Sequence, residues 1–509
     1  MRSQCNHCSR LSMAREFDVP GVKELTQEFY VAPDNLAIRY GIRFETRLEQ
    51  ELLANLGTED VQAPKTNSPS ETLDLMSHGV PIIYQGSLYG GSGKYPFSGR
   101  PDFLVRADYQ LHFSSEGLTT LRAVGNPKSY TAWDAKLSAV AKPEYQNQVA
   151  LYADVLKTYG MASNTHHGLI LGNRELVGFS KDVLFAQLEP ARAKLFAQMA
   201  VFESEIPATV DYLGPLHCDL SSYCQICEYP KLCDHARRQV SSLQLVAGIT
   251  GGQIQSLHDV GVKTVSDLAN FKGVTEKLTA EQVVKLSTQA RLQANQYLTG
   301  QPSFEVIAPE QLNVLPDSNP GDIFFDLEGF SFFDQPGGLE YLFGYVADLG
   351  DEFFHHWADT RTEEKHAFEQ FMTEILRRQK EFPGARIYHY ANYEQAALKR
   401  MALRYSSFEA EVQDLIDQGV FIDLYKVVKA SLMISQESYS IKKLETYYDF
   451  KRSADVKEAM GSMEYYDQYL ELAADNYPEA EKLKRQVITY NQEDCVSTLA
   501  LYRWLKSLS

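Results

Sequence analysis

Apolar residues at helical spacing mark the first predicted element of the chain. Phe44, Leu48 and Leu52 recur every four residues, as they do on one face of an amphipathic helix. Gly57 then supplies a stop signal. The pattern predicts a helix over residues 36–57.

Shorter apolar runs with strand-like character follow this helix. They lie around residues 80–89, 100–107 and 130–138, and the helical pattern of residues 143–160 comes next. A strand-rich region flanked by helices predicts an α/β or α+β first domain, which we place at residues 1–238.

The segment 246–271 combines short helical patterns with a tight turn that contains glycine. Thr264, followed three residues later by Asp267, predicts a capping box at the start of the second helix. The pattern resembles a helix-hairpin-helix module, whose turn and helix N-terminus can hold a phosphate. A plain helical domain fits the same pattern. We place this module at residues 239–300.

Four prolines among Asn and Asp residues in the segment 301–320 predict a linker. A second α/β domain is expected after it, over residues 321–509. The whole chain is therefore predicted to be an α/β multidomain protein.

The stretch GDIFFDLEGF opens this last domain with two acids close together. Because a strand repeats every two residues, Phe325 and Leu327 can face a core. Asp326 and Glu328 then project together from the other side. Two carboxylates this close repel each other unless a cation lies between them, so a divalent metal site is one interpretation. A strand end with two solvated acids is the other.

The composition is that of a multidomain globular protein. With 509 residues, two to four domains are expected. Hydrophobic residues make up 44% and charged residues 23%, and no run of about 18 apolar residues could span a bilayer. The first ten residues lack the apolar stretch of a secretory signal. We expect no membrane partner and a cytoplasmic location.

The net charge of -18 argues at first against a nucleic-acid partner, because phosphate binding relies on Lys and Arg. A nuclease, however, gathers acids around metal ions that supply positive charge to the phosphate. The charge therefore does not decide the partner. It predicts that any contact with nucleic acid is confined to local basic grooves.

Acids in the first domain have the types that metal-dependent hydrolysis requires. Asp102 heads an apolar strand, and Asp134 and Lys136 lie two residues apart on one face of another. Such a hydrolase needs acids to hold a cation and often an amine to orient water and stabilise charge. An isolated D-x-K is common and is usually an exposed ion pair.

The order of several motifs strengthens this pattern. RPD, DAK and QVALY follow one another, and Gln148 and Tyr152 lie four apart on one helical face. The order resembles the RecB-type PD-(D/E)XK nucleases, which share the restriction-endonuclease-like fold. By this resemblance, Gln148 and Tyr152 would shape the site and the strand being cut.

The same resemblance implies roles for the acids. Asp102 and Asp134 would bind the metal, and Lys136 would position the nucleophilic water. Some relatives use His as an upstream ligand, where this chain offers Glu45 or Glu49. We favour Glu45, because GIRFE resembles the corresponding stretch of the family.

Seven cysteines are present, and four of them crowd one segment. In a reducing cytosol such a cluster favours a metal or iron-sulfur site over disulfides. CQICEYPKLC resembles the C-x2-C-x5-C of RecB-like nucleases that bind a 4Fe-4S cluster with one further cysteine from the N-terminus. The resemblance implies the ligands Cys5, Cys224, Cys227 and Cys233. Cys8 and Cys218 lie outside that pattern, and a zinc site on Cys218, Cys224, Cys227 and Cys233 is the alternative.

The C-terminal segment supplies further acids. In YNQEDC, Tyr490 and Asp494 lie four apart and so share a helical face. The order D-x-E, middle acid, Y-x-x-x-D resembles the tyrosine-bearing DEDD exonucleases of the RNase H-like fold. IFFDLEGF and ITYNQEDCVSTLALYRWL resemble, more closely, the YprB-type RNase H-like domain fused to RecB-like nucleases.

This likeness implies a two-metal site. Asp326 would bridge two metals, and Glu328 and Asp494 would complete one site. Tyr490 would orient the attacking water for in-line displacement at a phosphodiester.

The middle motif departs from the family. It usually has Asn and then Asp four residues later, whereas Tyr390 and Glu394 take those places here. Glu394 is the predicted third acid. Asp423 is the alternative, although a structural role at a strand end explains it better.

Together these patterns predict a nuclease that uses Mg²⁺ or Mn²⁺ at two centres, the second acting from a 3' end. Single-stranded DNA is the favoured substrate, and RNA is possible. The alternatives are one active centre beside a binding domain, or a non-catalytic DNA-binding scaffold that recruits a helicase or repair partner. Because no G-x-x-x-x-G-K-[ST] loop is present, unwinding would need a helicase partner.

Overall fold

The computed structural model describes residues 5–30, 36–204, 206, 220, 224, 227–333, 337–347, 352–453, 461–474 and 478–509. The chain divides into two compact units, Met1–Asp234 and His235–Ser509. The predicted module at 239–300 and the predicted domain at 321–509 both lie in the second unit, so the boundary between them stays a prediction. Within the described ranges, no helix has the length and apolar character that a bilayer crossing requires.

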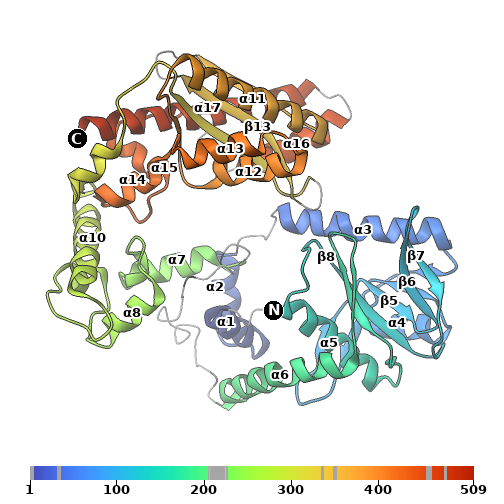
Figure 1. Cartoon of the computed structure of the whole chain (residues 1–509). Helices are drawn as coiled ribbons and strands as arrows, with labels where there is room; N and C mark the ends of the chain where they lie inside the picture. The colour runs from blue at the N-terminus through green and yellow to red at the C-terminus, as the bar shows by residue number, and fades with distance from the viewer. Residues whose placement is uncertain are drawn as a thin grey trace. The chain divides into compact units, whose positions relative to one another are not determined.

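The first unit combines helices with short strands (Figure 1). Its elements are α1 (Asn6–Glu16), α2 (Val22–Glu28), α3 (Leu36–Leu56), β1 (Val61–Gln62), α4 (Pro69–Ser77), β2 (Ile82–Tyr84), β3 (Leu88–Gly90), β4 (Phe97–Gly99), β5 (Phe103–Arg106), β6 (Tyr109–Ser114), β7 (Gly117–Arg122), β8 (Tyr130–Lys136), α5 (Pro143–Thr158), β9 (His167–Leu171), β10 (Leu176–Phe179) and α6 (Lys181–Ser204). The helix α7 (Pro230–Gln239) crosses the division between the units.

A mixed sheet in the order β1-β2-β5-β8-β9-β10 forms the centre of this unit. Leu48 and Leu52 of α3 pack with Phe103 and Trp133 on one face. On the other face, α4 and α5 cover the alternate side chains of β2, β5 and β8. The helix predicted for residues 36–57 is thus confirmed as α3. It ends at Gly57, whose φ of 84° lies in the left-handed region that a helix stop favours.

The second unit contains a helical region followed by an α/β region. Its elements are η5 (Leu243–Leu245), α8 (Gly251–His258), α9 (Val265–Ala269), α10 (Ala280–Thr299), β11 (Phe304–Val306), η6 (Pro309–Val314), β12 (Ile323–Phe330), β13 (Leu339–Ala347), β14 (Phe353–Trp357), α11 (Arg361–Glu381), β15 (Ile387–His389), α12 (Tyr393–Tyr405), α13 (Glu409–Asp417), β16 (Phe421–Asp423), α14 (Leu424–Ser431), β17 (Leu432–Ile434), α15 (Ile441–Leu444), η7 (Glu445–Tyr447), α16 (Ser462–Ala474) and α17 (Pro478–Ser507).

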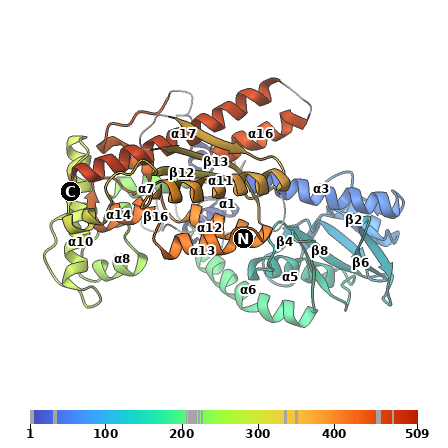
Figure 2. The ribbon, with the colours of Figure 1, turned by 45° about the horizontal axis from the view of Figure 1, so that its top comes forward.

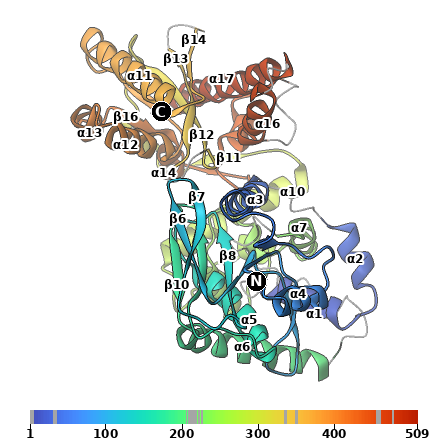
Figure 3. The ribbon, with the colours of Figure 1, turned by 90° about the vertical axis from the view of Figure 1, so that its right-hand side faces the viewer.

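A sheet in the order β14-β13-β12-β15-β16 organises the α/β region. Figures 2 and 3 show α11, α12 and α13 on one face of this sheet and α17 on the other. Phe325 and Leu327 pack toward α11 and α12, whereas Phe324 packs with α17 side chains. The predicted alternation along β12 is therefore confirmed, and it turns Asp326 and Glu328 toward α17.

Two smaller predictions meet different outcomes. The capping box is confirmed, because the Asp267 N–H donates to Thr264 Oγ1 at 3.0 Å and the Thr264 N–H donates to Asp267 Oδ2 at 2.9 Å. The linker predicted for residues 301–320 is partly structured: β11 pairs with β17, and Leu312 and Leu315 are buried. Proline misled the prediction because it also stands at helix starts, as it does in η6.

Candidate functional site

Three carboxylates converge where β12 meets α17. Asp326 and Glu328 come from β12 and Asp494 from α17, and one oxygen of each lies within 4.8 Å of the others. Among the described residues, this is the set of His, Cys, Asp and Glu side chains tight enough for three ligands to share one ion. Carboxylate oxygens are the ligands that Mg²⁺ and Mn²⁺ prefer.

Burial makes the charged form of this trio costly. Burial and the charge of Asp494 raise the pKa of Glu328 to about 8. Burial and Glu328 raise the pKa of Asp326 well above its usual value. The pKa of Asp494 is also raised by burial, although Arg452 opposes the shift. A cation among the three acids would restore their ionised form at neutral pH.

Neutral side chains hold the two acids of β12. Asn491 Nδ2 donates to Asp326 Oδ2 at 2.8 Å, and the Ser462 hydroxyl donates to Glu328 Oε2. These bonds orient the carboxylates and engage one oxygen of each. A carboxylate that accepts one such bond keeps further lone pairs, so each acid can still bind an ion.

Arg452 balances part of the negative charge. Its Nη2 donates to Asp494 Oδ1, and it also forms an ion pair with Glu445. Ser497 in turn donates to Glu445 at 2.9 Å. The pairing engages Oδ1 of Asp494.

Tyr490 lies one helical turn before Asp494 on α17. Lys442 Nζ donates to the Tyr490 hydroxyl oxygen at 2.7 Å and lies 4.7 Å from the ring centroid. Burial and Asp494 raise the pKa of Tyr490, so the hydroxyl keeps its proton at neutral pH. Since Lys442 uses a lone pair, Tyr490 can still donate that proton to an oxygen nearby.

The two candidates for the middle acid differ in their surroundings. Glu394 is buried near the start of α12, and its charge helps to raise the pKa values of Asp326 and Glu328. It thus belongs to the same electrostatic cluster, although it lies outside the 4.8 Å set. Its Oε2 is 3.3 Å from His389 Nδ1. Asp423 accepts two backbone N–H groups and caps α14, which is a structural role.

Gly344 makes room for this arrangement. It pairs with Asp326 across β12 and β13. A Cβ at Gly344 would lie 1.6 Å from Asn491 Oδ1. The absence of a side chain therefore lets α17 approach the sheet closely enough for Asn491 to bond Asp326.

In the first unit, Gln85 links two of the predicted metal ligands. Its amide donates to Glu45 on α3 and, at 3.1 Å, to Asp102 Oδ1 just before β5. The Ala135 N–H donates to Asp102 Oδ2 at 2.6 Å. The structure therefore brings Glu45 and Asp102 together. Glu49 lies close enough for Glu45 to help raise its pKa, after burial as the main cause.

Asp134 and Lys136 complete this cluster. Both side chains come from β8 and form an ion pair. Burial, Asp134 and Glu45 raise the pKa of Asp102, so the three acids lie within electrostatic reach of one another. Burial acts to lower the pKa of Lys136, but the negative charges of Asp134 and Asp102 have the larger effect, so the pKa is raised overall. The amine therefore stays charged.

The helix α5 places the other two predicted residues nearby. Gln148 Nε2 donates to the Tyr152 hydroxyl at 2.8 Å, and that hydroxyl donates to the Arg100 carbonyl at 3.1 Å. Burial and Asp134 raise the pKa of Tyr152. The pair therefore borders the acid cluster, with Tyr152 fixed by two hydrogen bonds.

Cysteines from both ends of the first unit meet. Cys8 Sγ is 3.3 Å from Cys227 Sγ, and the Cys8 N–H donates to Cys5 Sγ at 3.4 Å. His7 Nδ1 lies 3.2 Å from Cys233 Sγ. Cys8, set aside on sequence grounds, is thus at the centre of this cluster, and burial and Cys227 raise its pKa. Cys218 lies outside the described residues, so the alternative zinc set is not tested.

Sequence reasoning missed the residues that hold the acids in place. They are Gln85, Asn491, Ser462, Arg452 and Lys442. Asn491 carried a weak signal, because it follows Tyr490 on the same helix and a buried Asn needs a partner. The others come from loops or from distant segments, and no spacing pattern connects them to the acids.

In a comparison with known families, residues 323–506 match the RNase H superfamily. The protein is thus a mixed α/β multidomain protein with an RNase H-like domain at its C-terminal end. Such a domain indicates a nuclease-type, metal-dependent phosphodiester hydrolase that acts on nucleic acid. No curated protein and no solved structure matches the chain.

Proposed function

We propose, from the premise that residues 323–506 form an RNase H-like domain, that the protein is a metal-dependent exonuclease. It degrades single-stranded nucleic acid from a 3' end, with DNA favoured over RNA. One observation carries the proposal: one oxygen each of Asp326, Glu328 and Asp494 lies within 4.8 Å of the others, with Glu328 buried and the two aspartates partly buried.

The metal site would use these three acids, with Glu394 as an additional negative charge. When bound, Mg²⁺ or Mn²⁺ supplies positive charge to the scissile phosphate and lowers the pKa of a bound water. Asn491 keeps Asp326 oriented during substrate binding. The buried Arg452 limits the net charge of the site through its pairing with Asp494.

Tyr490 has the geometry of a positioning group. Its hydroxyl accepts from Lys442 and keeps its proton, so it can donate to the attacking water or to a phosphate oxygen. A fixed donor at this place orients the reacting oxygen before the bond breaks, which lowers the entropic part of the barrier. The half-buried ring of Tyr490 would also restrict the position of the nucleic-acid strand next to the acids.

A second centre is proposed in the first unit, of the RecB-like type. Glu45, Asp102 and Asp134 would bind a metal ion there, and Lys136 would orient the water once the metal takes its place beside Asp134. The hydrogen bonds from Gln85 to two of these acids support a shared site.

The cysteine cluster is proposed to hold a structural 4Fe-4S cluster, with zinc as the alternative. The cluster takes four thiolates, from Cys224, Cys227 and Cys233 and one N-terminal cysteine. The contact between Cys8 and Cys227, from opposite ends of the first unit, supports Cys8 as the alternative to Cys5 for that fourth ligand. Absorption in the visible blue together with iron analysis distinguishes iron from zinc.

The experiment compares wild-type protein with the Asp326→Asn and Asp134→Asn variants on end-labelled single-stranded DNA and RNA. Each reaction contains Mg²⁺, Mn²⁺ or a chelator. Wild type should shorten the 3' end only with metal, and Asp326→Asn should not. Binding without metal-stimulated cleavage by wild type would show a non-catalytic scaffold and refute the proposal. Loss of all cutting in only one variant would show a single active centre.

A further inference from the structure

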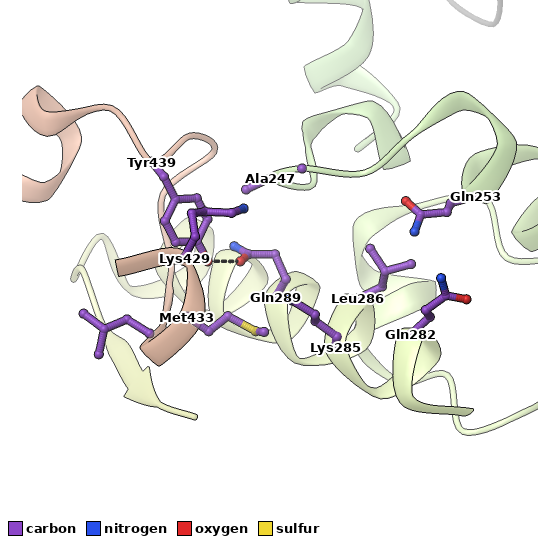
Figure 4. A pocket seen from close by; sticks show the side chains of 11 residues that line it. Ala247, Gln253, Gln282, Lys285, Leu286, Gln289, Lys429, Met433 and Tyr439 are labelled. Atoms are coloured by element: carbon purple, nitrogen blue, oxygen red, sulfur yellow. Dashed lines mark hydrogen bonds between the residues drawn. The ribbon is translucent and has the colours of Figure 1, made fainter. Parts of the chain in front are cut away.

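A cavity of about 280 Å³ lies within the second unit, and none of its lining residues belongs to the carboxylate centre (Figure 4). Its walls come from the segment around α8, from α10, and from α14, β17 and the loop that follows. The lining residues are Ala247, Gly248, Gln253, Gln282, Lys285, Leu286, Gln289, Lys429, Leu432, Met433 and Tyr439.

The charge of this cavity is positive and lacks a counter-charge. Lys285 and Lys429 both line it, and no Asp or Glu does. Within the described ranges, neither lysine has a carboxylate within ion-pair distance. Burial and the charge of Lys285 lower the pKa of Lys429, so the two ammonium groups repel each other. An anion between them would relieve that repulsion.

Lys429 is held in place by its surroundings. Its Nζ lies 4.1 Å above the centroid of the Tyr439 ring. The Tyr439 hydroxyl donates to Gln289 Oε1 at 2.8 Å, and Gln289 Nε2 donates to the Ile434 carbonyl at 2.6 Å. Gly248, with φ of 76°, would place a Cβ 3.4 Å from Lys429 Nζ, so a glycine leaves the ammonium open to the cavity.

Two glutamines add hydrogen-bond donors of fixed orientation. Gln253 Oε1 accepts the Thr250 N–H, and Gln282 Oε1 accepts the Thr279 N–H, each at 2.9 Å in a capping box. Because each oxygen already accepts a backbone N–H, the NH₂ group of each side chain is the group that remains for a ligand to accept from. Figure 4 shows both amides on the same side of the cavity. The polar wall therefore suits an acceptor-only anion.

We propose that this cavity binds a phosphate group of the nucleic-acid strand, held by Lys285 and Lys429 and by the amides of Gln253 and Gln282. The proposal rests on the proposed function, because it takes nucleic acid as the ligand. It adds a grip on the strand outside the catalytic centre. The turn at Gly261, where a helix-hairpin-helix-like module is expected to hold phosphate, does not line the cavity.

The test uses the full chain with Asp326→Asn, so that the strand stays intact, and measures fluorescence anisotropy of a labelled single-stranded oligonucleotide without metal. Adding Lys285→Gln and Lys429→Gln together should weaken binding about fivefold at 0.1 M salt and reduce the slope of log K against log salt by about 0.7. Lys272→Gln makes the same charge change at an exposed position of the same module and should change neither. Lys429→Arg should keep the binding.

Inorganic phosphate distinguishes the strand from a free ion as the source of the phosphate. It should raise the melting temperature of the parent protein and of Lys272→Gln, but not of the double-lysine variant. Melting curves without phosphate check that all variants fold.

Unchanged oligonucleotide binding in the double-lysine variant overturns the inference. If phosphate protection is lost in that variant while oligonucleotide binding is unchanged, the cavity serves a free phosphate and the strand assignment is wrong. Metal-dependent cutting by wild type is measured separately and reports on the proposed function. A protein that cuts while its lysine variants bind normally refutes this inference alone, whereas one that neither cuts nor binds refutes both.

Discussion

The acid clusters of the two units differ in the origin of their positive charge. In the first unit, Lys136 pairs with Asp134 on the same strand, so the cluster carries an internal cation. In the second, Asp326 and Glu328 have neutral hydrogen-bond donors. Of these three acids, Asp494 alone forms an ion pair within the described part of the chain, and its partner is Arg452.

The difference in charge between the two acid clusters depends on one position in each of the strands β8 and β12. Both strands present an acid and, two residues later, a second charged side chain on the same face. In β8 that second residue is Lys136, and in β12 it is Glu328. The first cluster can therefore fold with its charge partly balanced, whereas the second depends more strongly on a bound cation.

Removing one acid from each cluster tests whether the centres act separately. Asp326→Asn should slow 3' shortening of linear single strands by about 10²- to 10³-fold, because the site loses charge that holds metal and phosphate. Asp134→Asn should leave this activity and abolish cutting of circular single-stranded DNA, which has no end. Both rates are measured on gels with end-labelled and circular substrates.

Asp414→Asn, at an exposed position of α13, is the matched control and should cut both substrates normally. Equal losses on both substrates in the two site variants would contradict separate centres.

The pH dependence of local stability should have opposite signs around His167 in β9 and around Glu328 in β12. Burial lowers the pKa of His167 from 6.5 to about 4, so the unfolded chain takes up its proton first and stability falls as pH decreases from 6.5 to about 4. The loss can reach about 3 kcal/mol. The pKa of Glu328, raised from 4.5 to about 8, has the reverse effect: without metal, stability falls as pH rises through that range.

Hydrogen exchange of β9 and β12 amides in chelator, corrected for the intrinsic pH dependence of exchange, measures both effects. His167→Gln should flatten the acid limb in β9, and Mn²⁺ should flatten the alkaline limb in β12. A common direction in both strands would contradict the comparison.

Neutralising one acid should change stability in opposite directions when metal is absent. Asp134→Asn removes the ion-pair partner of the mostly buried Lys136 and should lower the free energy of unfolding by roughly 2 kcal/mol. Asp326→Asn removes repulsion from Glu328 and should raise it by roughly 1 kcal/mol.

Chemical denaturation in chelator gives both values, and Asp414→Asn should change neither. Destabilisation by Asp326→Asn equal to that by Asp134→Asn would show that the second cluster is already neutralised.

The smallest predicted effect concerns Lys442. Lys442→Gln should lower kcat for 3' shortening about tenfold with little change in KM, because Tyr490 loses the contact that fixes its hydroxyl. Lys442→Arg can still donate to Tyr490 and should recover most of the rate. Single-turnover kinetics separates this loss from weaker binding, and a change confined to KM would assign Lys442 to strand binding instead.

Sequence patterns predicted the parts of the fold that local physics controls. The four-residue spacing of Phe44, Leu48 and Leu52 indicated α3, and the alternation along β12 indicated which side its acids face. Thr264 and Asp267 indicated a helix start. In each case the residues that form the pattern lie within a few positions of the structural feature that they predict.

The supports of the two centres could not be predicted in this way. Gln85 stands in the left-handed region, with φ of 53°, directly after a short strand, and nothing in its sequence context shows that it bonds Glu45 and Asp102. Ser462 approaches Glu328 from a segment 134 positions away. Such contacts depend on tertiary packing, which periodicity does not report.

Gly344 has a consequence for how the proposed catalytic centre tolerates mutation. Its φ lies outside the left-handed range, so the backbone itself would accept other residues, and only space forbids them. A single methyl group there would push Asn491 and the helix that carries Asp494 away from β12. If the proposed site is the active centre, Gly344→Ala would lower activity by widening the distance between its acids, and a screen for inactive yet folded protein should find it.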